Sequence, residues 1–435
     1  MLNIQGAPKY FSLLFCLLLV YLIALLVGPR QPDDIERKRC QINIYLKKPF
    51  GVTIDCDAPD FLETASDLKK LLHPEAVRQS RPGFIFLAKY VSDIVRPLTN
   101  VLVKQINPVS PTTRTQEFQQ KGLTEFPAPF LSYAILNFIF LCMAFVLAKQ
   151  VVTTGQIAFA AASCLLLLAF NDVIKVFFYS PHTQIFNIFL PVLLVWTSHK
   201  IYNENFFEKP QMYLLMVLSG YGLACYGTFL LLPIVAVATE VIRRKLENNK
   251  LSLTMNDIKR VTGFAILFCA PMLLWSAYVI SINGKIFFYE AEVCGQFSWI
   301  KTIYSERGII ALFTQWVTNF YTALSYGFKF IPITLILGAV SLGFLKKYKL
   351  SISLKLCKLA ILCGCISFLY TVFFAFQGYF SSRLSVVIFV PVWIWIAALN
   401  QHIQDSGKNT CVYQTIFFAL ILGQGIYTVA NNNGF

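Results

Sequence analysis

Charged residues are scarce in this sequence, and they are scarcest in its long apolar stretches. Asp, Glu, Lys and Arg make up 14% of the 435 residues, whereas about 25% is typical of soluble domains. The apolar stretches hold almost no ionisable side chains, although ion-coupled transporters usually need such groups at membrane depth. We therefore expect any chemistry at the edges of the apolar stretches rather than inside them.

Metal-site and signal-peptide patterns are also missing. The four histidines and twelve cysteines form no CxxC pair and no cluster with metal-ligand spacing. No small-residue cleavage site follows the apolar segment 11–27, so we expect a retained first helix. Most cysteines lie inside apolar runs, where they act as small hydrophobic residues. Cys40 and Cys56 lie outside these runs, and a disulfide between them is an open alternative.

Apolar residues, in contrast, are abundant. Hydrophobic residues reach 56% and the mean hydropathy is +0.60, which indicates an all-α integral membrane protein. The apolar runs predict about eleven transmembrane helices. Two of these are short helices within 211–240 that turn near Cys225, and the others lie near residues 10–28, 130–148, 156–172, 183–198, 261–282, 328–345, 356–377, 384–399 and 411–430.

Positive charge predicts the orientation of this single polytopic domain (residues 1–435). The net charge is +15, and most of the positive charge in short loops falls on one face, which we expect to be cytoplasmic. We attribute the excess to topology and to contact with anionic membrane lipids, not to nucleic acid. Two long loops, residues 29–129 and 283–327, then face the outer side.

The first outer loop carries its own pattern. Apolar residues recur at helical spacing over 61–72 and 84–98, with charged residues opposite. Two amphipathic helices beside a membrane most simply lie along its surface. A small soluble cap domain is the alternative.

Four carboxylates cluster just after the first predicted span: Asp55, Asp57, Asp60 and Glu63. An enzyme that activates a hydroxyl needs a positioned base, and a carboxylate in a partly desolvated cleft suits this role. Asp57 is the first candidate for a catalytic base and Asp55 is the second. In the structural alternative, Asp57 caps the helix that Pro59 and Asp60 begin.

Two arginines stand at the predicted outer edges, Arg81 before the second amphipathic helix and Arg383 before a late span. Such an arginine can bind a lipid phosphate through two parallel hydrogen bonds and stabilise charge on a phosphate leaving group. The alternative is an arginine that snorkels to the interface. The loop before the fourth span adds Asp172 and His182. For each, the alternative is an ordinary loop residue with no role in substrate binding. Asp60, Arg81, Asp172, His182 and Arg383 are the candidates for substrate binding.

The order of these features resembles the GT-C superfamily of polytopic glycosyltransferases, which use lipid-phosphate-linked sugars. Asp57-x-x-Asp60-Phe61-Leu62-x-x-Ala65 is similar to a D-x-x-x-Y-x-x-A-like pattern of the family. Arg81-Pro82 opens the second juxtamembrane helix, where relatives often carry an R-P turn.

Two later elements extend the resemblance with departures. Pro181-His182-Thr183-Gln184 lies in the second outer loop, where relatives often have an acid in place of Gln184. Arg383 followed by Pro391 is similar to a late R-Y-x-x-x-x-P-like element, with Leu384 in place of the aromatic residue.

The resemblance implies an inverting glycosyltransferase that moves a sugar from a polyprenyl-phosphate donor to a lipid or surface-glycan acceptor. The first-loop aspartate, best matched by Asp57, would deprotonate the acceptor, while Arg383 and Arg81 would hold the phosphate. Relatives with monophosphate donors often need no metal, and some with diphosphate donors do. No cofactor is therefore certain, and a divalent metal (Mg²⁺ or Mn²⁺) stays open.

The expected location is a bacterial inner membrane, with the active site facing the periplasm. The absence of any N-x-S/T sequon favours this over the membrane of the endoplasmic reticulum. Two other functions stay open. A transporter or flippase of a lipid-linked glycan predicts an inverted repeat and a charged central cavity, and no repeat is evident. A non-catalytic membrane scaffold predicts that the outer-face acids are dispensable.

Overall fold

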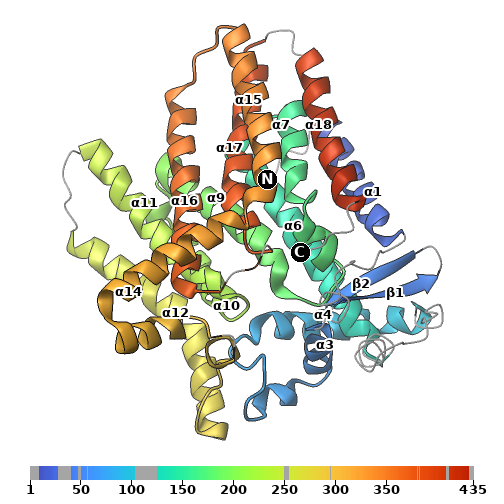
Figure 1. Cartoon of the computed structure of the whole chain (residues 1–435), viewed down its shortest axis with the longest axis vertical. Coiled ribbons are helices and arrows are strands. Elements are labelled where there is room, and N and C mark those ends of the chain that lie inside the picture. The colour runs from blue at the N-terminus through green and yellow to red at the C-terminus, as the bar shows by residue number, and fades with distance from the viewer. Residues whose placement is uncertain are drawn as a thin grey trace.

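The protein is a bundle of long helices with a smaller layer across one end, as the computed structural model shows (Figure 1). The structure describes residues 9–27, 41–47, 50–55, 57–102, 125–248, 254–293, 295–379, 381, 383–407 and 411–430. The loop that joins α15 to α16 lies at the opposite end of the bundle from that layer (Figure 1).

Seven helical segments in the described part of the chain are long and apolar enough to cross a membrane. They identify the chain as an integral membrane protein. One of them, Ser298–Lys347, joins two helices and the short 3-10 turn η7 (Phe328–Phe330). The long helices are α6 (Pro127–Val152), α9 (Phe186–Glu204) after the turn η4 (Thr183–Ile185), α12 (Met255–Asn283), α14 (Ser298–Ser325), α15 (Ile331–Lys347), α16 (Leu354–Gln377), α17 (Val386–Asp405) and α18 (Cys411–Ala430).

Shorter helices fill the space between these segments. Two are apolar but short, one in α1 (Lys9–Leu26) and one formed by α7 (Phe159–Leu165) with η3 (Leu166–Leu168). The remaining elements of the bundle are α8 (Asp172–Phe177), η5 (Phe206–Glu208), α10 (Pro210–Leu223), η6 (Gly227–Leu230), α11 (Leu231–Asn248) and α13 (Tyr289–Glu292).

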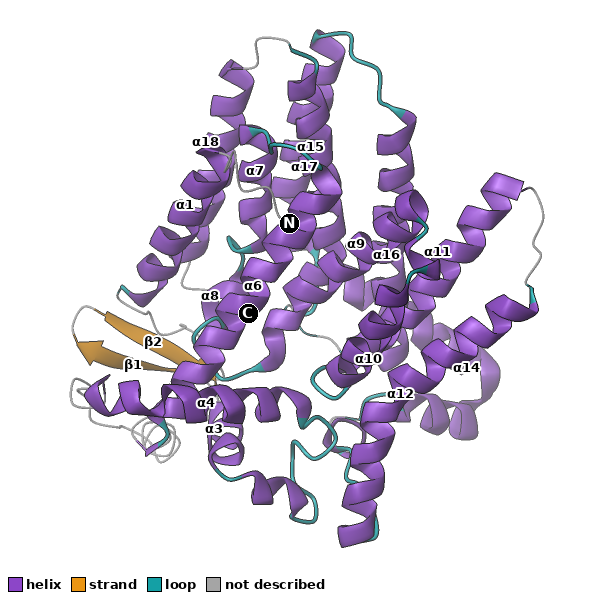
Figure 2. Cartoon of the chain, turned by 180° about the vertical axis from the view of Figure 1, so that it is seen from behind, coloured by secondary structure: helices purple, strands orange, loops and turns teal. Residues whose placement is uncertain are grey.

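The layer across the end of the bundle comes from the first loop (Figure 2). Strands β1 (Gln41–Lys47) and β2 (Phe50–Asp55) form an antiparallel hairpin in which Gln41 pairs with Asp55. The helices α3 (Ala58–Ser66), η1 (Leu68–Leu72) and α4 (Gly83–Leu102) follow. The amphipathic spacing over 61–72 and 84–98 thus corresponds to helices. The hairpin before them was not expected.

Burial varies strongly among the long helices. The central helices α9 and α17 have 78% of their apolar window buried, whereas α12 has 11%. A helix that is apolar all round and buried belongs to the interior, and one that is apolar but uncovered suits contact with lipid. Trp393 of α17, which is 1% exposed, donates its Nε1–H to Thr334 Oγ1 of α15 at 3.0 Å.

The predicted positions of the helices agree with the structure more closely than the predicted number of membrane spans does. The break expected in 211–240 occurs between the end of α10 at Leu223 and the start of η6 at Gly227. The count of about eleven spans is not confirmed, because seven segments meet the criterion among the described residues. Much of the predicted 283–327 loop is helix α14, which breaks at Gly308 with a φ of 76°. Cys40 and Cys56 lie outside the described residues.

Candidate functional site

A cavity of about 440 Å³ lies where the first-loop layer meets the bundle. Its wall combines six segments that are far apart in sequence. They are the β2–α3 junction, the residues before α4, the residues before α9, the η6 turn, and two late segments around α13 and the α16–α17 connection. Three acids (Asp55, Asp57, Glu290) and three arginines (Arg78, Arg81, Arg383) are among its lining residues.

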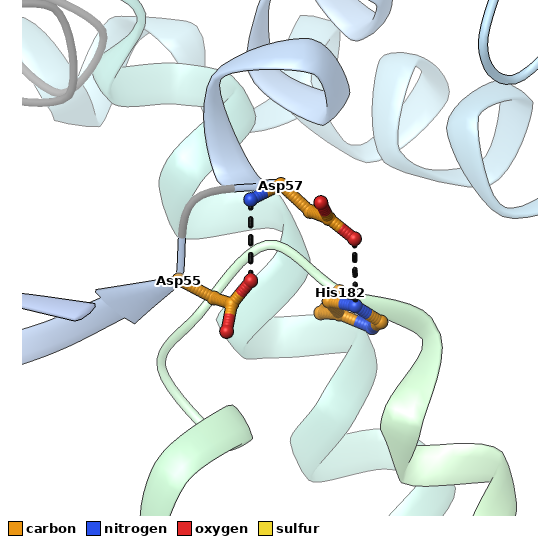
Figure 3. Close-up of side chains that lie close together, drawn as sticks. All are labelled: Asp55, Asp57 and His182. Atoms are coloured by element: carbon orange, nitrogen blue, oxygen red, sulfur yellow. Dashed lines mark hydrogen bonds and ion pairs between the residues drawn. The ribbon is translucent and has the colours of Figure 1, made fainter. Parts of the chain in front are cut away.

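Asp57 sits at the start of α3 with one carboxylate oxygen engaged and the other open. Its Oδ2 lies 3.0 Å from Arg78 Nη2. The same oxygen lies 3.4 Å from His182 Nε2 (Figure 3). Its Oδ1 makes no hydrogen bond or ion pair with a described residue. Asp57 is the N-cap residue of α3, with Pro59 and Asp60 in the first turn, as the structural alternative predicts, but its side chain makes no capping hydrogen bond to the helix. The carboxylate is instead 40% exposed at the cavity.

The charge state of Asp57 follows from its two neighbours. Burial alone would raise the pKa of Asp57, but the contact with His182 and the positive charge of Arg78 outweigh it and hold the pKa well below its usual range. Burial lowers the pKa of His182, so the imidazole is neutral at pH 7. Its Nε2 approaches Asp57 Oδ2 at 3.4 Å, and neither ring nitrogen has a hydrogen-bond partner among the described residues.

Aromatic rings fix the two partners of Asp57. The Phe61 ring lies 4.3 Å from Arg78 Cζ, with the guanidinium over its face. The His182 ring lies between Phe61 and Phe177, with centroid distances of 5.5 and 5.0 Å. Phe61 is 1% exposed, so this ring is a rigid support for both groups.

Asp55 ends strand β2 and is more deeply buried than Asp57, at 6% exposed. Its N–H donates to Ser180 Oγ at 3.1 Å, and its Oδ1 accepts from the Asp57 N–H at 3.2 Å (Figure 3). Burial raises the pKa of Asp55. Two neighbouring carboxylates thus have pKa values displaced in opposite directions, an arrangement often found at acid–base sites.

Arg383 approaches the cavity from the α16–α17 connection. Its Nε is buried and has no hydrogen-bond partner among the described residues. Its Nη2 lies 3.4 Å from the Tyr379 hydroxyl, and its Cζ lies 5.6 Å from the centre of the Phe177 ring. It forms no ion pair with a carboxylate of the described chain. Asp55 and Asp57 raise the pKa of Arg383 without contacting it, so this partly buried guanidinium keeps donors that suit an anionic ligand.

The amide of Gln79 joins the first loop to the wall around α13. Gln79 is 1% exposed. Its Nε2 donates to the carbonyls of Leu71 and His73, and its Oε1 accepts from the Phe287 N–H at 2.7 Å. Its own carbonyl accepts from Trp275 Nε1 at 2.7 Å. We call these four hydrogen bonds of Gln79 the clamp. Arg78 directly precedes Gln79 and Arg81 follows two residues later, so the clamp positions both arginines.

Arg81 lies at the cavity but already has a partner. Its Nη1 is 3.2 Å from Glu290 Oε1, and Ser80 Oγ donates to Glu290 Oε2 at 3.0 Å. The Arg81 and Glu290 side chains are 23% and 12% exposed. The arginine expected to hold phosphate is therefore neutralised by a residue 209 positions away in the chain.

Asp55, Asp57 and His182 also have the spacing of a metal site, with their ligand atoms within 4.8 Å of one another. Mg²⁺ and Mn²⁺ favour oxygen ligands whose negative charge is free. Asp57 Oδ2 already faces the Arg78 guanidinium at 3.0 Å, which would repel a divalent cation. The residues present fit such a metal poorly, and we assign it no role.

Two other expected substrate-binding residues lie away from the cavity. Asp60 is exposed in the first turn of α3 and does not line the cavity. Asp172, at the start of α8, pairs with Lys329 Nζ at 2.9 Å and also lies outside it. Asp55, Asp57, Arg81, His182 and Arg383 do line it.

Two cavity residues were missed as site residues, Arg78 and Glu290. Each matters through a partner that only the fold brings near, Asp57 for Arg78 and Arg81 for Glu290. Neither has a spacing pattern in sequence that would single it out. The sequence gives only a weaker indication for these two residues. Both lie in the predicted outer loops, on the side of the membrane where the site was expected.

The fold and site together define a helical membrane protein with a carboxylate- and arginine-lined cavity at one end of its bundle. Comparisons with models of protein families, with curated proteins and with solved structures found no match. The functional argument therefore depends on the chemistry of the cavity.

Proposed function

We propose that this protein is an inverting glycosyltransferase. It moves a sugar from a polyprenyl-phosphate donor to the hydroxyl of a lipid or surface-glycan acceptor, at the outer face of the membrane. We propose the periplasmic face of a bacterial inner membrane, with the lumenal face of the endoplasmic reticulum as the alternative. Support comes from a polar cavity beside apolar helices, because such a place gives water-soluble chemistry access to a lipid-borne donor.

In this proposal Asp57 is the base. Its open Oδ1 accepts the acceptor hydroxyl proton while Arg78 and His182 hold Oδ2 and fix the carboxylate orientation. The acceptor oxygen forms a bond to the anomeric carbon of the donor sugar. The bond from that carbon to the phosphate oxygen breaks, and its electron pair leaves on the phosphate. Asp55, whose pKa burial raises, is the second candidate base.

Arg383 stabilises the departing phosphate in the same step. Its unpartnered Nε and its Nη2 beside Tyr379 offer donors to an oxygen that gains charge. Interactions of this kind favour the transition state when charge grows on the leaving group. Arg383 and Tyr379 line the same cavity as Asp57.

The single observation that carries the proposal is the pairing of two opposite features in one cavity. One is a carboxylate with an oxygen free to accept a proton, and the other is an arginine with no direct ion pair to a described carboxylate. Proton acceptance and phosphate departure are the two events that glycosyl transfer from a lipid phosphate requires. Neither event needs a group that the cavity lacks.

The test is Asp57→Asn, with Asp60→Asn as the matched control because Asp60 is an aspartate on α3 that does not line the cavity. These two variants and Asp55→Asn are each expressed in cells that depend on the native gene. The masses of extracted lipids and surface glycans are then measured by mass spectrometry. We expect Asp57→Asn to remove a sugar-sized mass increment at normal protein level, since loss of a general base costs about 10²–10⁴ in rate. Asp60→Asn should retain it.

An unchanged glycan profile with both Asp57→Asn and Asp55→Asn would reject the cavity as a catalytic site. A lipid-linked glycan that accumulates on the inner face would instead point to a flippase.

A further inference from the structure

The three arginines of the cavity differ in their counter-ions. Arg78 pairs with Asp57 at 3.0 Å, and Arg81 pairs with Glu290 at 3.2 Å. Arg383 forms no ion pair with any carboxylate in the part of the chain that the structure describes. Asp55 and Asp57 act on Arg383 only at longer range, where they raise its pKa, so the cavity presents one guanidinium without a direct ion pair to a described carboxylate.

Glu290 forms an ion pair with Arg81 in which its Oε1 makes no hydrogen bond to a described residue. Its second oxygen accepts from Ser80 Oγ at 3.0 Å, and this hydrogen bond holds the carboxylate beside Arg81. Gln79, immediately before Ser80, is hydrogen-bonded to the N–H of Phe287 in the same segment as Glu290. An anion that needs Arg81 has to displace a carboxylate whose side chain is 12% exposed, and breaking such a pair leaves a charge without a partner in a dry site.

The charge of a lipid-linked sugar donor depends on its number of phosphates. A sugar joined to the lipid through one phosphate is a phosphodiester with one negative charge. A sugar joined through two phosphates carries two. One free guanidinium matches the first, whereas the second charge of a diphosphate would meet Arg81 already neutralised.

We propose that the cavity selects a lipid phosphodiester with a single phosphate, and that Glu290 determines this specificity by occupying Arg81. The inference rests on the proposed function, because it names the donor class for that same site. It adds a role for a residue that has no part in the transfer step itself.

The experiment measures binding without sugar transfer. The probes are farnesyl methyl phosphate, which carries one charge, and the corresponding farnesyl methyl diphosphate, which carries two. The full-length protein in lipid nanodiscs is titrated with each, and farnesyl methyl ether serves as the uncharged reference. Dimethyl phosphate, which has the anion without the lipid, tests whether a free phosphate ester binds equally well.

The wild-type protein should bind the monophosphate probe about tenfold more tightly than the diphosphate, the effect expected of one lost charged hydrogen bond. Glu290→Gln frees Arg81 and should strengthen diphosphate binding by about tenfold on the same basis, with little change for the monophosphate. Adding Arg81→Gln to Glu290→Gln should abolish that gain. Glu292→Gln, an exposed neighbour in the same segment, should leave both affinities unchanged.

Three results would overturn the inference: equal or tighter binding of the diphosphate by the wild type, a Glu290→Gln variant with an unchanged affinity ratio, or dimethyl phosphate binding as tightly as the lipid probe. The wild-type ratio needs no variant, so the test stands even where Glu290→Gln fails to fold. Selective binding without any sugar transfer would reject the proposed function and retain the donor class. Sugar transfer from a diphosphate donor would do the reverse.

Discussion

Gly83 marks the point where the first loop is packed against the bundle, and it has no room for a side chain. Its N–H donates to the Ala224 carbonyl at 2.8 Å, and its own carbonyl accepts from the Tyr221 hydroxyl at 2.6 Å. A Cβ added at Gly83 would lie 2.7 Å from Cys225 Sγ and 3.0 Å from the Ala224 carbonyl carbon. We therefore expect Gly83→Ala to push α4 away from the turn that follows α10.

The size of this effect follows from the contact distances. Ordinary contacts of a Cβ begin at 3.4 Å, so the Ala224 backbone or α4 has to shift by several tenths of an ångström. Overpacking of this kind typically lowers the free energy of unfolding by about 1–3 kcal/mol. The shift in thermal midpoint per kcal/mol shrinks as chains lengthen, so we expect a fall of roughly 2–5 °C for this chain.

The assay is thermal unfolding of the purified protein in detergent, followed by the loss of its monodisperse peak. Gly338→Ala is the matched control, because Gly338 lies within helix α15 and a Cβ there meets nothing within 4 Å. That variant should be neutral or slightly more stable, since alanine favours a helix over glycine by about 1 kcal/mol.

A second variant separates the steric cause from others. Cys225→Ala removes the Sγ atom that lies nearest the added methyl group, so Gly83→Ala should cost less in that background. Rescue should be partial, because the Ala224 carbonyl carbon stays at 3.0 Å. If Gly83→Ala matches Gly338→Ala in stability, or if the two costs simply add in the double variant, the packing described for this contact is incorrect.

Three further perturbations test the charges. Arg78→Gln removes the cation that keeps Asp57 ionised; because that carboxyl is 40% exposed, we expect a loss of about 1–2 kcal/mol at pH 7. The loss should shrink as the pH falls below about 4, where Asp57 of the unfolded chain takes up a proton, and should vanish only as the pH falls through the much lower pKa of folded Asp57. Melting curves across pH would test this, because a difference that does not shrink in acid would contradict it. Asp172→Asn breaks a partly exposed pair with Lys329 and should cost under about 1 kcal/mol, with binding of the monophosphate probe unchanged; weakened binding would mean that Asp172 reaches the site. Glu240→Gln removes the carboxylate that Arg243 and Arg244 share in a buried network, and thermal unfolding should show a loss of about 3–5 kcal/mol, whereas a neutral result would mean that the network is hydrated.

The helices of the fold were accessible from sequence because their signals are local. The spacing of Phe61, Leu62 and Ala65 predicted a helix, and all three are buried in α3. The hairpin had a local signal as well, since Ile42, Ile44 and Leu46 alternate with polar residues and are followed shortly by Pro49 and Gly51 in the sequence. This alternation is short, and the helical and apolar patterns on either side of it are stronger, so the sequence did not lead us to expect a hairpin.

The site was only half accessible, for a different reason. Asp57 could be singled out because it belongs to a cluster of four carboxylates after the first predicted span, and Arg383 because it stands where a late apolar run begins. The role of Arg78 depends on the position of Asp57 after folding, and that of Glu290 depends on Arg81. Asp172 was also a candidate from sequence, but in the structure it forms an ion pair with Lys329 away from the cavity. Long-range pairing, which no local pattern encodes, separates the two aspartates.

The clamp at Gln79 has a consequence for biogenesis. The residues that its amide and carbonyl bind, Phe287 and Trp275, are translated 208 and 196 positions later. Asp57, Arg78 and His182 have by then long left the ribosome, while this buried amide still lacks its distal partners. The cavity wall around Glu290 can close only when α12 and the segment after it have been inserted. Completion of the site is thereby tied to late membrane insertion, so a chain truncated before residue 275 would expose its carboxylates without enclosing them.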